Sequence, residues 1–185
     1  MIVGKRGMSG TADHPFPRAS MAGGAYVVSG LASAFLAYTR SVCAAYFCGA
    51  ALCCALSVKV IKNFVRQPRP LGVTPLKSYG MPSTHSAVMF FYAGTVVLTS
   101  TTLPIHPSLP DHPYIRVWPP LVAGTSAVVV ALSRVWWGHH DFLQIAAGSL
   151  YGATCSIIAY KMWVSGLDVY GHSLEAWLGA FMGWH

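Results

Sequence analysis

The sequence has 185 residues, of which 54% are hydrophobic and only 9% are charged. Roughly a quarter of the residues in a soluble domain are charged, so this composition excludes an ordinary soluble protein and favours a membrane protein with several spans. Twelve Lys and Arg residues against five Asp and Glu residues give a net charge of +7. Such an excess suits nucleic acid, an anionic lipid surface or an anionic substrate. We expect no nucleic-acid partner, because the chain has no basic run and is mostly apolar.

Apolar runs divide the chain into five predicted transmembrane helices, which together form an all-α bundle. A helix of about 20 residues crosses the hydrocarbon core of a bilayer. The predicted spans cover residues 20–39, 42–61, 84–103, 117–135 and 142–164. We expect a flexible tail over residues 1–19, a transmembrane domain over 20–164 and a C-terminal tail over 165–185. Apolar residues in this last segment recur every three or four positions, which predicts a short helix lying in the membrane interface.

Polar residues and prolines mark the ends of these spans. Arg40 interrupts the first apolar run, and because an arginine in mid-bilayer is costly, we place it in a turn between two helices. Pro68 and Pro70 end the second span. Pro119 and Pro120 are expected in the first turn of the fourth span, where proline is tolerated.

Three polar stretches lie at the ends of the predicted spans. Residues 62–70 end the second span, residues 80–86 begin the third, and residues 133–144 connect the fourth and fifth. Because successive spans cross the membrane in alternating directions, all three stretches fall on the same side. One cluster at one face of the bilayer can therefore hold Lys62, Arg69, His85, Arg134 and His140.

This set of side chains suits an anion with several negative oxygens. Its three cations need a counter-charge that the five acidic residues of the chain cannot supply. Arg matches phosphate oxygens with its fork of donors, and Lys supplies a point charge. Two imidazoles can serve as nucleophile and proton donor in phosphoryl transfer. Ser83, Thr84 and the backbone N–H groups at the start of the third span add hydrogen-bond donors for the anion.

Three short motifs in these stretches resemble the signature of the type-2 phosphatidic acid phosphatase superfamily. The first runs from Lys62 to Arg69-Pro70, the second is Pro82-Ser83-Thr84-His85, and the third runs from Ser133-Arg134 to His140. The family pattern is KxxxxxxRP, PSGH and SRxxxxxHxxxD, and its order and spacing agree over residues 62–144. The resemblance implies the helical-bundle fold of this superfamily, which the vanadium haloperoxidases share.

The resemblance also implies a role for each matched residue. His140 corresponds to the nucleophile that forms a phosphohistidine, and His85 to the acid that protonates the leaving group. The residues that correspond to those holding the phosphoryl oxygens are Lys62, Arg69, Ser83, Thr84 and Arg134. The family uses no metal, and we expect neither a metal nor another cofactor in this chain.

Two positions depart from the superfamily pattern. Thr84 replaces the usual glycine, and Gln144 stands where the family has the aspartate that orients the nucleophilic histidine. Residues four apart share one face of a helix, so we expect the Gln144 side-chain oxygen to accept a hydrogen bond from His140. Glutamine and a small hydroxyl residue are usual at these positions in the dolichyl-diphosphate phosphatases. The chain also resembles these enzymes over residues 61–63, 67–70, 79–86, 133–135 and 140–144.

This closer resemblance implies a substrate and a location. The reaction is the hydrolysis of dolichyl (polyprenyl) diphosphate to dolichyl phosphate and inorganic phosphate, which recycles the lipid carrier of protein N-glycosylation. The site then faces the lumen of the endoplasmic reticulum, although the Lys and Arg residues outside the site divide too evenly to set the orientation. Membrane lipids are the other expected partners, and the sequence leaves the oligomeric state open.

Two alternatives stay open. A broad lipid phosphate phosphatase would act on phosphatidate or related monoesters through the same residues. A catalytically inactive relative would only bind anionic lipid; the retained cations and histidines argue against it, whereas Gln144 keeps it open. Trp136 and Trp137, beside the third motif, are typical of an interfacial aromatic belt or would line the lipid entrance.

Overall fold

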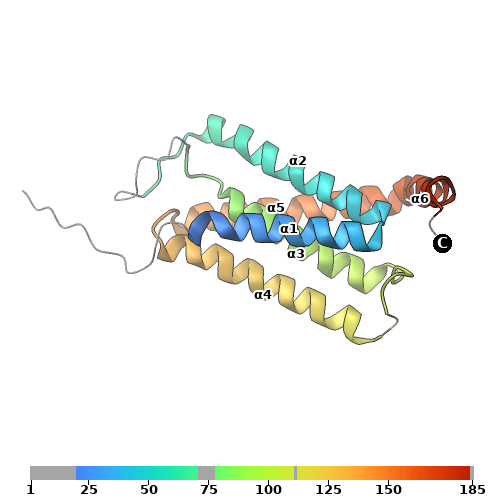
Figure 1. Cartoon of the computed structure of the whole chain (residues 1–185). Helices are drawn as coiled ribbons and strands as arrows, with labels where there is room; N and C mark the ends of the chain where they lie inside the picture. Colours follow the sequence, from blue (N-terminus) through green and yellow to red (C-terminus); the bar gives the residue numbers. More distant parts are fainter. Residues whose placement is uncertain (1–19, 71–77, 111, 184–185) are drawn as a thin grey trace, which may run out of the picture.

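The computed structural model describes residues 20–70, 78–110 and 112–183, with side chains in the first helix from residue 30 onward. The elements in these ranges are α1 Ser20–Thr39, α2 Val42–Val65, α3 Thr84–Thr102, α4 Tyr114–Trp136, α5 Phe142–Met162, a π-helical turn Trp163–Leu167 and α6 Asp168–Met182 (Figure 1). All are helical, so the prediction of an all-α bundle is confirmed. The flexible tail predicted over residues 1–19 lies outside the described residues.

The helices follow the predicted spans closely, with one correction in α4. This helix begins at Tyr114, earlier than predicted, so Pro119 and Pro120 lie inside it and not in its first turn. The extra turn is held by Arg116, whose Nη1 donates a hydrogen bond of 2.9 Å to the Ser100 carbonyl at the end of α3. Pro119 and Pro120 have no backbone N–H and so remove hydrogen bonds from α4. The contact of Arg116 with α3 offsets part of this loss.

The helix α3 lies at the centre of the bundle, against α2, α4 and α5 (Figure 1). Its contact with α5 is the most extensive, because glycines of α5 leave room for the α3 backbone. A Cβ atom on Gly148 would lie 2.5 Å from the Ser83 carbonyl oxygen, and one on Gly152 would overlap the Ala87 carbonyl. Small residues allow this close approach between membrane helices. The contact places the first turns of α3 and α5 side by side.

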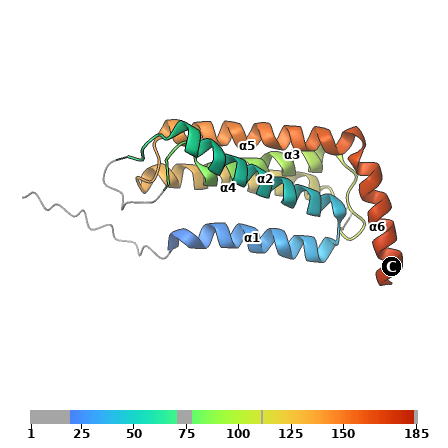
Figure 2. The same cartoon turned by 90° about the horizontal axis from the view of Figure 1, so that it is seen from above.

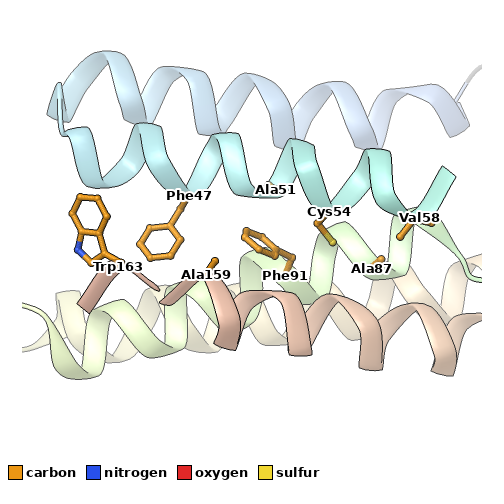
Figure 3. Packing of buried hydrophobic residues seen from close by; sticks show 8 residues of the cluster. All are labelled: Phe47, Ala51, Cys54, Val58, Ala87, Phe91, Ala159 and Trp163. Carbon is orange, nitrogen blue, oxygen red and sulfur yellow. The ribbon is translucent and has the colours of Figure 1, made fainter. Parts of the chain in front are cut away.

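Buried side chains between α2, α3 and α5 form the hydrophobic core (Figure 3). One face of α2 supplies Phe47, Ala51, Cys54 and Val58 at helical spacing. They pack against Ala87 and Phe91 of α3, Ala159 of α5 and Trp163 of the following turn. Lys62 continues the same buried face beyond Val58. The packing of α2 therefore carries a lysine side chain into the interior at the end of the bundle.

Three helical segments within the described residues are long and apolar enough to cross a membrane. They are Val42–Val65, Tyr114–Trp136 and the continuous run Phe142–Met182. The central helix α3 is not in this group, and its first and last turns carry His, Ser and Thr. With α1 and α3, the bundle has the five helices that the sequence predicts.

The helix α6 crosses the end of the bundle at a steep angle to α5 (Figure 2). The chain bends at Gly166, whose φ of 132° lies in a region that favours glycine. Two contacts hold the bent segment. Trp163 fills the space that a side chain at Gly171 would need, and His106 pairs with Glu175 at 3.0 Å. These contacts fix α6 across the end where α2 begins and α5 ends.

We propose that α6 lies in the membrane interface, because Tyr170, Trp177 and Phe181 are 76%, 60% and 77% exposed and aromatic rings favour that layer. Lipids brominated near the head group should therefore quench Trp177 fluorescence, measured as the difference between the wild type and Trp177→Phe. The fluorescence of Trp163, measured as the difference between the wild type and Trp163→Phe, should be far less quenched, because this side chain is only 3% exposed. A Trp177 signal that responds to an aqueous quencher and not to these lipids would contradict the proposal.

Candidate active site

Four helix ends meet at one end of the bundle: the last turns of α2 and α4 and the first turns of α3 and α5 (Figure 1). The loop after α2 adds Arg69 to this end. Charges here act on one another: His140 is within electrostatic range of Arg69 and Lys62, and His85 is within range of Arg134. His140 and His85 also act on each other. The structure thus brings the three polar stretches of the sequence into one cluster.

The cations of this cluster have no acidic partner in the part of the chain that the structure describes. Within the described residues, the ion pairs are those that Glu175 makes at the opposite end of the bundle. Lys62 is only 7% exposed, and the Arg134 Nε is buried with no hydrogen-bond partner among the described residues. A buried charge without a counter-charge is costly. The arrangement is therefore that of a site for an anion.

Arg69 is fixed by the loops around it. Its Nε and Nη2 donate hydrogen bonds to the Ser78 carbonyl oxygen (3.2 Å) and hydroxyl oxygen (3.0 Å). Its Nη1 donates to the His139 carbonyl at 3.1 Å and lies 3.4 Å from His140 Nε2. An arginine stays charged at neutral pH even where burial lowers its pKa, as it does here. The guanidinium therefore places a fixed positive charge beside the imidazole.

Gln144 sets the tautomer of His140. Asp141 caps α5 by accepting a hydrogen bond of 2.7 Å from the Gln144 N–H, which puts Gln144 one turn beyond the histidine. The Gln144 Nε2 donates to the Pro68 carbonyl at 3.0 Å. A carbonyl only accepts, so this contact turns the Gln144 oxygen toward the imidazole. That oxygen lies 2.9 Å from Nδ1, so Nδ1 carries the proton and Nε2 presents a lone pair.

The surroundings of His140 keep this imidazole neutral. Burial, together with nearby positive charges, lowers its pKa to about 4, and the hydrogen bond to Gln144 works in the opposite direction. Those charges belong to Arg69, Lys62 and His85. At neutral pH the Nε2 lone pair is therefore available, as a nucleophile requires.

Ser83 and Thr84 begin α3, and the structure gives them different surroundings. Ser83 is fully buried as the N-cap, where its hydroxyl oxygen accepts hydrogen bonds from the Ser86 N–H (3.4 Å) and hydroxyl (3.1 Å). The Ser83 N–H donates to the Gln144 carbonyl at 3.0 Å, which ties α3 to α5. Thr84 is half-buried. Ser83 thus fixes the first turn of α3, and the contact of either hydroxyl with a phosphate stays a prediction.

Sequence reasoning did not identify Ser78, Gly80 or the Pro68 carbonyl as parts of this site. Gly80 directly precedes Met81-Pro82, and a glycine in such a turn indicates a close approach of the backbone to another group. This pattern could have identified Gly80 from the sequence. No sequence pattern marks Ser78, because its role depends on where the fold places Arg69.

The model of the PAP2 superfamily matches residues 38–165 of this chain. The chain belongs to the PAP2 superfamily. Its curated relatives include dolichyldiphosphatase from Saccharomyces cerevisiae, which is 32% identical over 104 residues, and dolichyldiphosphatase 1 from Dictyostelium discoideum, which is 34% identical over 103 residues. Sphingosine-1-phosphate phosphatase 2 from Homo sapiens is 27% identical over 112 residues. The resemblance found in the three motifs is confirmed.

These matches are partial in length. They cover 51%, 55% and 57% of this PAP2 chain, and 41%, 44% and 26% of the yeast, Dictyostelium and human proteins. The chain thus spans less than half the length of the curated relatives it matches.

A solved PAP2 structure has the same fold. The first transmembrane PAP2 type phosphatidylglycerolphosphate phosphatase from Bacillus subtilis is similar with a TM-score of 0.61, over 81% of this chain and 71% of that chain. The two sequences are 20% identical, so the likeness concerns the fold alone. Together with the apolar helices, it identifies this PAP2 protein as an integral membrane helical bundle.

Gly80 lies against the Gln144 amide, where a Cβ atom would come within 2.5 Å of Nε2 and 2.7 Å of Oε1. We expect Gly80→Ala to push this amide away from His140 and to lower kcat about 10-fold, since residues that orient a reacting histidine have effects of this size. Phosphate release from a lipid substrate measures the effect. Gly124→Ala in α4, where a Cβ atom meets nothing within 4 Å, should keep wild-type activity. Equal activities of the two variants would contradict the positioning role of Gln144.

Proposed function

We propose that this PAP2 protein hydrolyses dolichyl or another polyprenyl diphosphate, releasing inorganic phosphate and leaving the lipid monophosphate in the membrane. The observation that carries the proposal is Gln144, whose neutral side-chain oxygen lies 2.9 Å from His140 Nδ1. Curated relatives of the chain include dolichyldiphosphatases, which supports the same substrate.

The chemistry of the leaving group connects Gln144 to a diphosphate. An amide oxygen stabilises the positive charge that develops on His140 less than a carboxylate would, so Gln144 lowers the barrier to attack on phosphorus less. A lipid diphosphate has a lower barrier to begin with, because its leaving group is a phosphate, which departs far more readily than the alcohol of a monoester. Gln144 is therefore better matched to a phosphoanhydride than to a phosphate ester.

The first step forms a covalent intermediate. Lys62, Arg69 and Arg134 surround the terminal phosphoryl oxygens and offset the charge that gathers there. The His140 Nε2 lone pair attacks the terminal phosphorus, and the bond from this phosphorus to the bridging oxygen breaks. The lipid monophosphate leaves with that electron pair. His85, whose protonated form is favoured by the negative charge of the bound diphosphate, donates a proton to the departing oxygen. Gln144 holds the Nδ1 proton throughout.

The second step uses water. His85, now neutral, removes a proton from a water molecule as its oxygen attacks the phosphorus of the phosphohistidine. The Nε2–phosphorus bond breaks and its electron pair returns to His140. Inorganic phosphate is released, and both histidines return to their starting protonation states.

A comparison of lipid substrates tests the proposal. The purified protein in detergent micelles should hydrolyse dolichyl diphosphate with a kcat/KM about 10-fold or more above that for phosphatidate, with phosphate release as the measurement. Equal or higher activity on phosphatidate would contradict the preference for diphosphates and favour a broad lipid phosphate phosphatase. An absence of hydrolysis with both lipids would favour a catalytically inactive, lipid-binding relative.

A second candidate substrate is a phosphorylated long-chain base. The observation that favours it is the similarity to sphingosine-1-phosphate phosphatases, which match this chain about as well as the dolichyldiphosphatases do. Sphingosine-1-phosphate therefore belongs in the same assay. A kcat/KM for this monoester above that for dolichyl diphosphate would replace the first proposal with the second.

We propose further that the protein resides in the endoplasmic reticulum with the site facing the lumen, following the dolichyldiphosphatase relatives. The helix α6 lies at the end of the bundle opposite the site (Figure 1), so a fluorescent protein fused after α6 would then be cytoplasmic. Protease added to sealed microsomes should remove the fused protein. Full protection of the fusion would contradict the lumenal orientation of the site.

The lowered pKa of His140 predicts an unusual pH profile. A histidine with an ordinary pKa of about 6.5 is half protonated, and half lost as a nucleophile, at that pH. Because the pKa of His140 lies at about 4, kcat/KM should hold as the pH falls through 6.5 and should decline only toward pH 4. The ionisation of the substrate is measured by phosphorus NMR in the same micelles and divided out. A decline centred on pH 6.5 after this correction would contradict a neutral, shielded His140.

A further inference from the structure

Ser78 occupies one whole edge of the Arg69 guanidinium. Its carbonyl oxygen accepts a hydrogen bond from Nε at 3.2 Å, and its hydroxyl oxygen accepts one from Nη2 at 3.0 Å. Nε and Nη2 share one side of a planar fork, so the two bonds together set the plane in which the group lies. Ser78 itself is exposed, so its effect on the site passes through Arg69.

The opposite edge of the guanidinium faces the nucleophile. Its Nη1 donates to the His139 carbonyl at 3.1 Å and lies 3.4 Å from His140 Nε2. Because Gln144 keeps the imidazole proton on Nδ1, Nε2 is an acceptor for an N–H of Arg69. A cation therefore lies at the lone pair that attacks phosphorus in the proposed mechanism.

A phosphoryl group that enters the site has to take over this contact. Its phosphorus must reach Nε2, and its oxygens are stronger acceptors for an arginine N–H than a neutral imidazole is. An Arg69 held by Ser78 needs only to exchange one acceptor for another, without a search through its rotamers. Less conformational entropy is then lost when the phosphate binds.

We propose that Ser78 is a positioning residue, which holds Arg69 with its outer edge at His140 Nε2, so that this edge moves onto a phosphoryl oxygen when the lipid phosphate binds. The inference rests on the proposed function and deepens it, because it assigns a residue outside the three motifs to the binding of the phosphoryl group.

The charged and titratable groups around His140 allow the position of Arg69 to be followed through the pKa of this imidazole. They are Lys62 from α2, Arg69 from the following loop and His85 from α3, while α5 contributes the uncharged Gln144. Arg134 of α4 acts on His85 and on His139. An Arg69 released from Ser78 spends less time beside His140, so it lowers the pKa of this imidazole less. The acid limb of kcat/KM then moves to higher pH.

The test compares Ser78→Ala, Ser78→Thr and the wild type on dolichyl diphosphate. Ser78→Ala removes a hydrogen bond to a charged group, so KM should rise about 10-fold with a smaller change in kcat. The acid limb of kcat/KM should move upward with the same substrate, and the thermal midpoint should not change. Ser78→Thr keeps the hydroxyl and should restore both the KM and the acid limb. Tyr79→Phe removes the neighbouring hydroxyl and should match the wild type.

Two results would overturn the inference. One is a Ser78→Ala protein with the KM and acid limb of the wild type. The other is an equal loss of activity in Ser78→Ala and Ser78→Thr with a lowered thermal midpoint, which would give Ser78 a purely structural role.

Vanadate binding separates this inference from the proposed function. Vanadate resembles the five-coordinate phosphoryl group, and calorimetry measures its affinity without any turnover. An affinity about 10-fold weaker in Ser78→Ala supports the positioning role even if no lipid phosphate is hydrolysed. An unchanged affinity overturns the role even if the wild type hydrolyses dolichyl diphosphate readily.

Discussion

Replacing His140 by alanine is expected to lower phosphate release from the preferred lipid by about 10,000-fold, the scale on which loss of a nucleophile acts in other covalent enzymes. The reason is that, in the proposed mechanism, the Nε2 lone pair attacks phosphorus while Gln144 keeps the proton on Nδ1. Lipid labelled with ³²P at the terminal phosphate should leave an acid-labile, base-stable label on the wild type and none on His140→Ala.

His139 provides the matched control for this experiment. It adjoins the nucleophile in the chain, and its contact with Arg69 is made by its backbone carbonyl, which alanine retains. His139→Ala should therefore keep the covalent label and lose less than about 10-fold in activity. A label that persists in His140→Ala and disappears in His139→Ala would reverse the assignment of the nucleophile.

The fold could be predicted from the sequence where local patterns decide the structure. Apolar runs separated by Arg40 and by Pro68 correctly predict the end of α1 and the break after α2. The start of α4 could not be predicted, because the turn before Pro119 depends on the contact of Arg116 with the end of α3. The bend at Gly166 likewise depends on the contacts that hold α6 across the bundle.

The candidate site likewise contains features that the sequence predicts and features that depend on the fold. The interaction of His140 with Gln144 could be predicted, because residues four apart share one helix face wherever the helix lies. The environment of the amide could not, since the Pro68 carbonyl and Gly80 reach it from a loop far away in the sequence. The cap that the Ser83 hydroxyl forms at the start of α3 was not predicted, and its contact with phosphate stays a prediction.

We expect Arg134 to contribute to anion binding and to destabilise the protein when no anion is bound. Its Nε is buried without a hydrogen-bond partner among the described residues, and Lys62 and Arg69 belong to the same cluster. A charge in this position is unfavourable until the negative oxygens of a phosphate arrive. The positive charge of Arg134 should therefore raise activity and lower the stability of the protein when no anion is bound.

Arg134→Gln should lower kcat/KM for the lipid diphosphate by about 1,000-fold, because a charged contact to the phosphoryl oxygens in the transition state is lost. The same change should raise the thermal midpoint of the empty protein by about 2–4 °C, since it relieves roughly 1 kcal/mol of unfavourable charge. Vanadate, which stabilises the wild type by binding, should stabilise the variant much less.

Arg116→Gln, at the other end of α4, should show the reverse pattern. Its guanidinium bonds to the Ser100 carbonyl far from the site, so its loss should lower the midpoint and leave kcat/KM unchanged. An Arg134→Gln protein that is inactive and less stable than the wild type would show that Arg134 supports the fold and would contradict an anion-binding role for this cluster.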